Sequence, residues 1–174
     1  MSLETARLKL IPAAPAHILT LIEDPERFEQ RASFPASRGL REMFVSGEVS
    51  PDWLAALRDS QEPDPWRYGF FLVHRDTSAA IGAAGFKGPP DTTTGMVEIA
   101  YGIVPSFERQ GYATEAAAAL VVFAFEVPSV TLIRAHTLPT SKASQRVLIK
   151  CGFHHVANVD DPDDGAVSRW ERTR

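Results

Sequence analysis

The chain has 174 residues, of which 44% are hydrophobic and 23% are charged, and its formal net charge is −4. This length and near-average composition predict a single globular domain, residues 1–174, that is large enough to bury a hydrophobic core. Proteins that bind nucleic acid carry a basic face, and no run of Lys or Arg would form one here. Cys151 is the only cysteine, which excludes an internal disulfide and a C-x-x-C metal site, so we expect no bound metal.

The start of the chain lacks the charged-then-apolar order of a signal peptide. No apolar stretch approaches the roughly 20 residues that are needed to cross a bilayer. We therefore expect a cytoplasmic protein that makes no membrane contact.

The N-terminal half is predicted to mix short strands and helices. Its clearest helix start is Ser50-Pro51-Asp52. The serine hydroxyl can cap the N-terminus of the helix, proline is favoured at the first helical position, and an acidic residue is favoured in the first turn. The segment 26–49 shows no regular pattern. The predicted elements are a strand over 6–11, a helix over 15–23, a helix from Pro51, and strands over 68–74 and 79–86.

The C-terminal half alternates strands with two longer helices, and the fold class that follows is mixed α/β (α+β) with a hairpin-rich sheet. The predicted elements are a strand over 96–104, a helix over 114–125, a strand over 130–137, a helix from Thr140 or Ser141 to Gly152, and strands over 153–159 and 167–172 around an acidic turn at 160–165.

A charged turn centred on glycine precedes the first of these helices, in the stretch "FERQGYATEAAAALVVFAF". Gly111 can adopt backbone angles that other residues avoid, and Ala113 keeps the main chain open to a ligand. The helix that follows is apolar all round, and its N-terminus offers unpaired N–H groups that suit a phosphate. The alternative is an ordinary turn that leads into a core helix.

Three segments in this order resemble the GNAT superfamily of N-acetyltransferases, and within it the RimJ/RimL-like group that acetylates protein N-termini and some small amines. The segments are "ETARLKLIP", "VEIAYGIVPSFERQGYATEA" and "HTLPTSKASQRVLIKCGF". The resemblance implies the GNAT fold, with a central mixed, mostly antiparallel sheet of six to seven strands flanked by about four helices. It also implies acetyl-CoA as cosubstrate.

The turn is where this resemblance and the anion argument meet. The family pattern is Gln or Arg, two residues, Gly, one residue, then Gly or Ala, and this chain departs from it with Glu108 in the first position. Backbone N–H groups and the Arg109 guanidinium remain as phosphate donors. The coenzyme-binding residues implied by the resemblance are Ile103, Val104, Arg109, Gln110, Gly111, Tyr112, Ala113, Thr114, Ser141 and Ser144.

Glu98 is the candidate general base. Strand alternation places Glu98 on one face with Ala100 and Gly102, two small residues that leave room for a substrate. The resemblance assigns an acid at this position the role of a base that acts through water. The alternative is a structural ion pair with Arg134 on the neighbouring strand.

The departing thiolate has a candidate partner on the later helix. Many members of the family protonate it with a tyrosine at the position that is Leu148 here, whereas the RimJ/RimL-like helix carries Asn-x-x-Ser, matched by Ser141 and Ser144. Ser141, Ser144, Gln145 and Leu148 share one helical face. Ser144 either donates to the sulfur or bonds back to its own helix, and Ser141 either contacts the coenzyme or only caps.

The predicted function is transfer of acetyl from acetyl-CoA to a primary amine, by direct attack in a ternary complex. The amine is a peptide N-terminal α-amine or a small-molecule amine, and the protein is a monomer or a homodimer. A non-catalytic acyl-CoA-binding or sensing module is the alternative.

Overall fold

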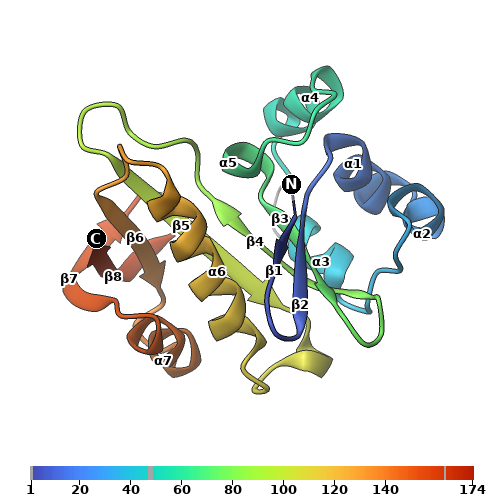
Figure 1. The fold of residues 1–174 in the computed structure, drawn as a ribbon. Coiled ribbons are helices and arrows are strands. Elements are labelled where there is room, and N and C mark those ends of the chain that lie inside the picture. Colours follow the sequence, from blue (N-terminus) through green and yellow to red (C-terminus); the bar gives the residue numbers. More distant parts are fainter. Residues whose placement is uncertain (1, 47–48, 163) are drawn as a thin grey trace.

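The computed structural model describes residues 2–46, 49–162 and 164–174, and these residues form an eight-stranded sheet with helices on both faces (Figure 1). The strands are β1 Leu3–Glu4, β2 Leu8–Pro12, β3 Phe70–His74, β4 Ala80–Phe86, β5 Met96–Ile103, β6 Leu132–Thr137, β7 His154–Asp161 and β8 Gly165–Thr173. The helices are α1 Pro15–Glu23, α2 Phe28–Ala32, α3 Leu40–Val45, α4 Pro51–Asp59, α5 Pro65–Tyr68, α6 Tyr112–Glu126 and α7 Lys142–Lys150, with 3-10 turns at Pro25–Arg27 and Pro105–Phe107.

The sheet is mixed and mostly antiparallel, as predicted, in the order β1-β2-β3-β4-β5-β6-β8-β7. Its described part holds eight strands and seven α-helices, more than the predicted six to seven strands and about four helices. The additional elements are short: β1 has two residues, α5 four, α2 five and α3 six. Segments of this length complete at most two turns, so they show no hydrophobic period in the sequence. Of the predicted turn 160–165 and the segment 26–49, Asp163, Gly47 and Glu48 lie outside the described residues.

Local sequence explains the clearest helix boundaries. Ser50 accepts a hydrogen bond from the Trp53 N–H at 3.4 Å, which confirms the predicted cap of α4. Gly152 follows α7 with φ +81°, the left-handed conformation that favours glycine after a helix. Ser141 occupies the N-cap position of α7, but its side chain makes no capping hydrogen bond.

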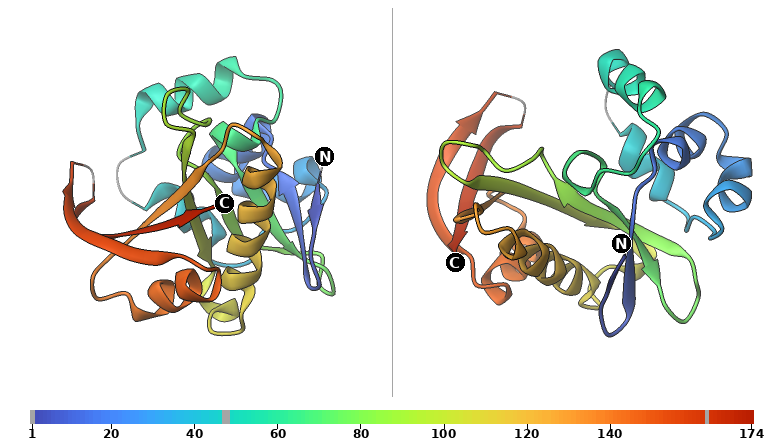
Figure 2. Two further views of the ribbon diagram at one scale, coloured as in Figure 1. Left: turned by 60° about the vertical axis from the view of Figure 1, so that its left-hand side comes forward. Right: turned by 45° about the horizontal axis from the view of Figure 1, so that its top comes forward.

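The two faces of the sheet carry different helices, as the right-hand view of Figure 2 shows. The helices α6 and α7 cover one face, and α1 to α5 cover the other over β2 to β4. Ala116, Leu120 and Ala124 of α6 are fully buried, whereas Val122 is 63% exposed. Apolar residues therefore reach the outer side of α6 as well, as predicted, but this side faces solvent, so the helix is not buried all round.

The sheet divides where β5 and β6 diverge. These parallel neighbours pair at three positions only, Met96–Glu98 with Leu132–Arg134. Beyond that point β5 continues beside β4 as far as Ile103, and β6 continues beside β8 as far as Thr137. The two strands therefore present edges that face each other across a widening gap. After β5 the chain continues through the turn at Gly111 into α6.

Candidate functional site

The turn before α6 has the backbone form that an anion site needs. Arg109 and Gly111 adopt left-handed angles, with φ +61° and +87°, and Gly111 is the N-cap of α6 without any capping side chain. The first N–H groups of this helix therefore keep their donors for a ligand. The side chains of Arg109 and Gln110 are exposed. Glu108 lines a separate hollow of about 620 Å³ between α3 and this turn.

Arg7, from the residues just before β2, holds the turn in place. Its Nη1 donates to the Gln110 carbonyl at 2.8 Å, its Nε donates to Glu115 at 2.9 Å, and its guanidinium lies 4.3 Å from the Tyr112 ring centroid. The Tyr112 hydroxyl forms a hydrogen bond with Nε2 of His74 at 2.9 Å, so Tyr112 can offer a ligand only its backbone groups. The turn is thus fixed to the N-terminal segment of the chain without a bound ligand.

The other predicted coenzyme-binding residues differ in how accessible they are to a ligand. Ala113 and Thr114 stand in the first turn of α6, and the Ile103 side chain is half-buried at the end of β5. Val104 is fully buried, its N–H donates to the Ile81 carbonyl at 2.8 Å and its carbonyl accepts from the Phe107 N–H at 2.9 Å, so both of its backbone groups already have partners. Ser141 and Ser144 are half-buried on α7, together with Gln145. Leu148 on the same helical face is fully buried.

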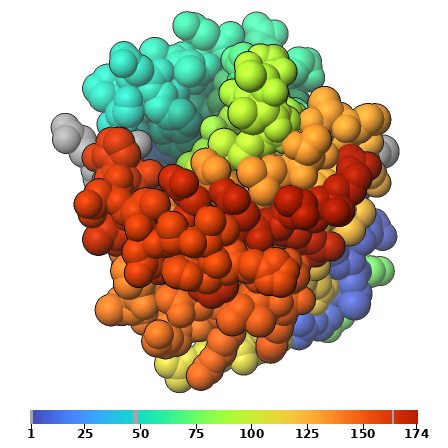
Figure 3. Space-filling model, turned by 90° about the vertical axis from the view of Figure 1, so that its left-hand side faces the viewer, coloured from blue at the N-terminus to red at the C-terminus, as the bar shows by residue number. Residues whose placement is uncertain are grey.

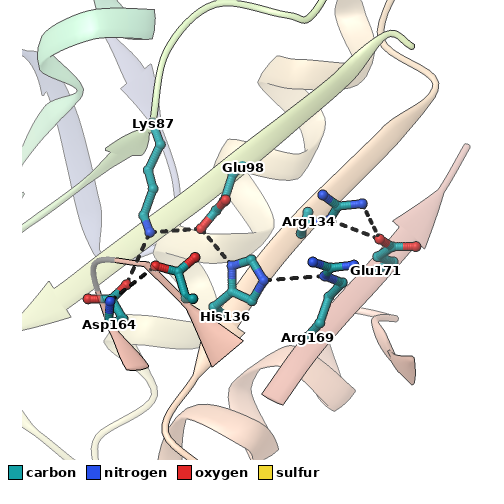
Figure 4. A network of polar contacts seen from close by, with 8 residues as sticks. Lys87, Glu98, Arg134, His136, Asp164, Arg169 and Glu171 are labelled. Atoms are coloured by element: carbon teal, nitrogen blue, oxygen red, sulfur yellow. Dashed lines mark hydrogen bonds and ion pairs between the residues drawn. The ribbon is translucent and has the colours of Figure 1, made fainter. Parts of the chain in front are cut away.

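Glu98 lies at the centre of a polar network that crosses the sheet (Figure 4). His136 of β6 donates through Nδ1 to Glu98 Oε1 at 2.9 Å, and the Lys87 ammonium lies 2.9 Å from the same oxygen. Arg169 of β8 donates to His136 Nε2 at 3.4 Å, and Lys87 also reaches Asp164 at 3.4 Å. Arg134 pairs with Glu171 at 2.7 Å. The alternative of a Glu98–Arg134 pair is therefore wrong.

The network fixes the charge state of Glu98. The Glu98 side chain is 17% exposed and that of His136 is 8% exposed. Burial alone would raise the pKa of the Glu98 carboxyl, but hydrogen bonds from Lys87 and His136 outweigh it and hold this pKa below its ordinary value. Glu98 is therefore a carboxylate at neutral pH. Both described contacts use Oε1, which leaves Oε2 oriented by the network for another donor.

A cavity of about 320 Å³ lies on the same face of the sheet, between β4, β5, α3 and α5. Ala100 and Gly102 form part of its lining beside Ala83 and Gly85, and Met43 lies over Gly102. A Cβ at Gly102 would stand 2.5 Å from Met43 Cε, the end of a flexible side chain, so a larger residue there would displace the Met43 methyl group. The remaining lining residues are Phe44, Arg67, Tyr68, Gly69, Ala84, Phe86 and Tyr101.

The region beyond this cavity is bounded by the segment between β4 and β5 and by β7 and β8. In Figure 3 that segment, in yellow-green, lies against the orange and red strands and below the α4 region. Lys87 and Asp164 join the two sides. Glu98 therefore lies where the cavity, the diverging strands and this polar bridge meet.

Sequence reasoning missed several residues of this site, namely Arg7, Lys87, Tyr101, His136 and Arg169. Alternation along β6 places His136 on one face with Arg134, but the register of this strand against β5 was not known from the sequence. Lys87 directly follows β4, and its reach to Glu98 depends on β4–β5 pairing. Among the described residues no group of three or more His, Cys, Asp or Glu is placed to hold a metal. In the same part of the chain, no helix has the length and hydropathy to cross a membrane.

Comparisons with known proteins agree with this geometry. A family described as "Acetyltransferase (GNAT) domain" matches residues 7–154. The uncharacterized N-acetyltransferase YjdG of Bacillus subtilis (strain 168) is 36% identical over 90 residues, which are 52% of this chain and 51% of YjdG. The chain thus spans about half the length of these curated relatives, of which a second Bacillus subtilis N-acetyltransferase, YoaA, is 33% identical over 93 residues.

Two solved structures extend the comparison. The ribosomal-protein-S5-alanine acetyltransferase of Vibrio fischeri superposes with a TM-score of 0.68 at 13% identity, over 99% of this chain and 96% of that one. The aminoglycoside acetyltransferase AAC(6')-Ib, in complex with coenzyme A, superposes with a TM-score of 0.52 at 25% identity, over 60% of this chain and 66% of that one.

Proposed function

Because the chain belongs to the GNAT acetyltransferase family, we propose that it transfers an acetyl group from acetyl-CoA to a primary amine in a ternary complex. One observation carries the proposal. Strand β5 presents the oriented carboxylate of Glu98 beside a cavity, and the same strand leads into the turn at Gly111. A cosubstrate whose phosphates bind at the turn can extend along β5 and bring its thioester to the amine near Glu98.

The reaction follows from these positions. The neutral amine nitrogen attacks the thioester carbonyl carbon, the C–N bond forms, and the C–S bond breaks with its electron pair going to sulfur. The proton lost by nitrogen passes through water to Glu98 and then to solvent. The Ser144 hydroxyl, on the half-buried side of α7, donates a hydrogen bond to the departing thiolate. Nucleophile and electrophile react directly, with no covalent enzyme intermediate.

The charge state of Glu98 favours weakly basic amines. A carboxylate with a lowered pKa is a weak base, so most of the acceptor must already be neutral. A peptide α-amine with a pKa near 8 is roughly a fifth neutral at pH 7.4, whereas a lysine amine near 10.4 is neutral about one part in a thousand. We therefore infer that the acceptor is a peptide N-terminal α-amine or a small amine of similar basicity.

An amine panel tests the proposal. Thiol release from acetyl-CoA is measured with N-terminal peptides of varied first residue, amino acids, polyamines and aminoglycosides, and coenzyme binding is measured by calorimetry. Release with at least one α-amine supports the proposal. Tight binding without release for any amine would instead assign the non-catalytic acyl-CoA-binding module.

A further inference from the structure

Tyr101 occupies the point where β5 and β6 have just separated. It lies three residues beyond Glu98, the last β5 residue that pairs with β6. Its ring is half-buried against the core, and its hydroxyl reaches across the gap to α7, where it donates to the Ser144 carbonyl at 3.4 Å. The phenol therefore lies between the strand that carries Glu98 and the helix that carries Ser144.

This hydroxyl has a poor partner. Hydrogen bonds between two oxygens are normally about 2.7–2.8 Å long, so a 3.4 Å contact is weak. Burial raises the pKa of the Tyr101 phenol above its ordinary value, so the group stays protonated and remains a donor at neutral pH. A half-buried donor with a weak acceptor is a site where a better acceptor binds favourably.

The elements around Tyr101 limit what that acceptor is. Cys151 Sγ lies 3.5 Å from the Thr114 carbonyl, so the end of α7 is close to the first turn of α6. A coenzyme whose phosphates bind at this turn can run past α7 along the gap between β5 and β6, toward the point where the two strands meet. Its thioester then passes Tyr101, the phenol that opposes Ser144 across the gap.

Resting on the function proposed above, we propose that Tyr101 is a catalytic residue that donates a hydrogen bond to the coenzyme sulfur as the thiolate leaves. The C–S bond breaks with its electron pair on sulfur, the phenol keeps its proton, and solvent later protonates the thiolate. The phenol does not transfer its proton fully, because a phenol is less acidic than a thiol of pKa about 8.5, so the proton stays on the phenol oxygen. Leu148 is fully buried and supplies no donor, so the phenol compensates from the opposite side of the gap.

The test uses the bound coenzyme itself, so that it does not depend on turnover. Coenzyme A is bound to the wild type and to Tyr101→Phe, and the ultraviolet absorbance of the thiolate is followed against pH. A hydrogen bond to the thiolate lowers the pKa of the bound thiol, so Tyr101→Phe should raise that pKa by about one unit. In turnover, kcat should fall about tenfold, with KM for acetyl-CoA changed less than twofold.

Two controls separate the sulfur from the rest of the coenzyme. Desulfo-coenzyme A should bind the wild type and Tyr101→Phe equally, which also shows that the variant is folded. Thr20→Ala removes another hydroxyl bonded to a main-chain carbonyl, on α1 and at 2.7 Å, and should leave kcat unchanged. An unchanged thiol pKa and kcat in Tyr101→Phe would overturn the inference, as would an equal loss of affinity for both coenzymes. If the wild type binds no coenzyme A, the proposed function and this inference both fail.

Discussion

Glu98 is held by two donors on one oxygen, and this arrangement determines how it can act. Glu98→Gln keeps the shape of the side chain and removes the proton acceptor, so kcat should fall about 10²-fold at pH 7, the usual scale for loss of a general base. The deficit should shrink as pH rises, because the acceptor amine then loses its proton without help. The measurement is the pH profile of kcat for both proteins.

A matched control for this variant is Glu171→Gln, which removes a carboxylate that pairs with Arg134 outside the cavity. We expect it to leave the pH profile unchanged. A deficit of Glu98→Gln that stays the same at every pH would contradict the base role and would mean that the carboxylate only positions the acceptor.

Ser144 poses a separate question about the leaving group. If its hydroxyl donates to the departing thiolate, Ser144→Ala should lower kcat roughly tenfold, about 1.4 kcal/mol, and leave acetyl-CoA affinity nearly intact. The interaction grows only as charge develops on sulfur, and a thiolate of pKa near 8.5 leaves partly unassisted. Steady-state kinetics measure the change in kcat, and calorimetry measures the affinity for acetyl-CoA. Weaker acetyl-CoA binding with kcat spared would make Ser144 a coenzyme contact instead.

The sequence predicted the positions of single residues better than their partners. Alternation placed Glu98 on one face with Ala100 and Gly102, and the structure has this face beside the cavity. The partners Lys87 and His136 come from a neighbouring turn and from β6. Which side chains meet across a sheet depends on strand order and register, and one sequence contains neither directly.

At the scale of elements, the turn before α6 is the feature most open to a direct test. Gly111→Glu places a negative charge and a side chain where phosphate is proposed to bind, so acetyl-CoA binding should be abolished. The substitution also forces a non-glycine residue to φ +87°, which costs about 1–2 kcal/mol. Calorimetry of coenzyme binding measures the first effect and thermal unfolding measures the second.

Gly165→Glu is the control for backbone strain, because Gly165 has φ +71° and its added Cβ would meet nothing within 4 Å, whereas a Cβ at Gly111 would also stand 3.1 Å from Arg7 Nη2. The control should lose similar stability and keep acetyl-CoA affinity. Equal affinity of the Gly111 and Gly165 variants would contradict phosphate binding at this turn.

Long elements with strong boundary signals were predictable, and short ones were not. The helix α1 and the strands β4 and β5 match their predicted ranges within one residue, and α4 begins at the predicted Pro51, because proline and capping residues mark such boundaries. The helices α2, α3 and α5 are held by packing against the sheet and not by their own period. Since α3 and α5 line the cavity, this part of the site was the hardest to predict from the sequence.

At the scale of the whole molecule, Glu115 of α6 joins the helix to the start of the chain. It accepts hydrogen bonds from the Thr5 hydroxyl and from the Arg7 N–H and Nε. Burial raises the pKa of Glu115, but these bonds outweigh it and lower the pKa below the ordinary value. A lowered folded-state pKa stabilises the protein above the unfolded pKa of about 4.5, and this stability is lost as pH falls through the folded value.

Glu115→Gln should therefore lower Tm at pH 7, and the difference from the wild type should shrink as pH falls below the unfolded pKa of Glu115 and disappear once pH is below its folded pKa. Thermal unfolding across this range is the measurement. A difference that persists unchanged at low pH would show that the contact acts through shape and not through charge. Because Arg7 also holds the Gln110 carbonyl, the variant should weaken coenzyme binding moderately as well.

The divergence of β5 and β6 makes the proposed cosubstrate a structural part of the protein. Three paired positions are the only ladder that joins the two halves of the described sheet, so the facing edges of residues 99–103 and 135–137 exchange amide hydrogens readily unless a ligand lies between them. Acetyl-CoA at 100 times its Kd should add about 2.7 kcal/mol to stability. Hydrogen–deuterium exchange should show this protection concentrated at the two edges. The supply of coenzyme would then govern the lifetime of the folded protein as well as its rate of turnover, and depletion of acetyl-CoA would expose it to proteolysis.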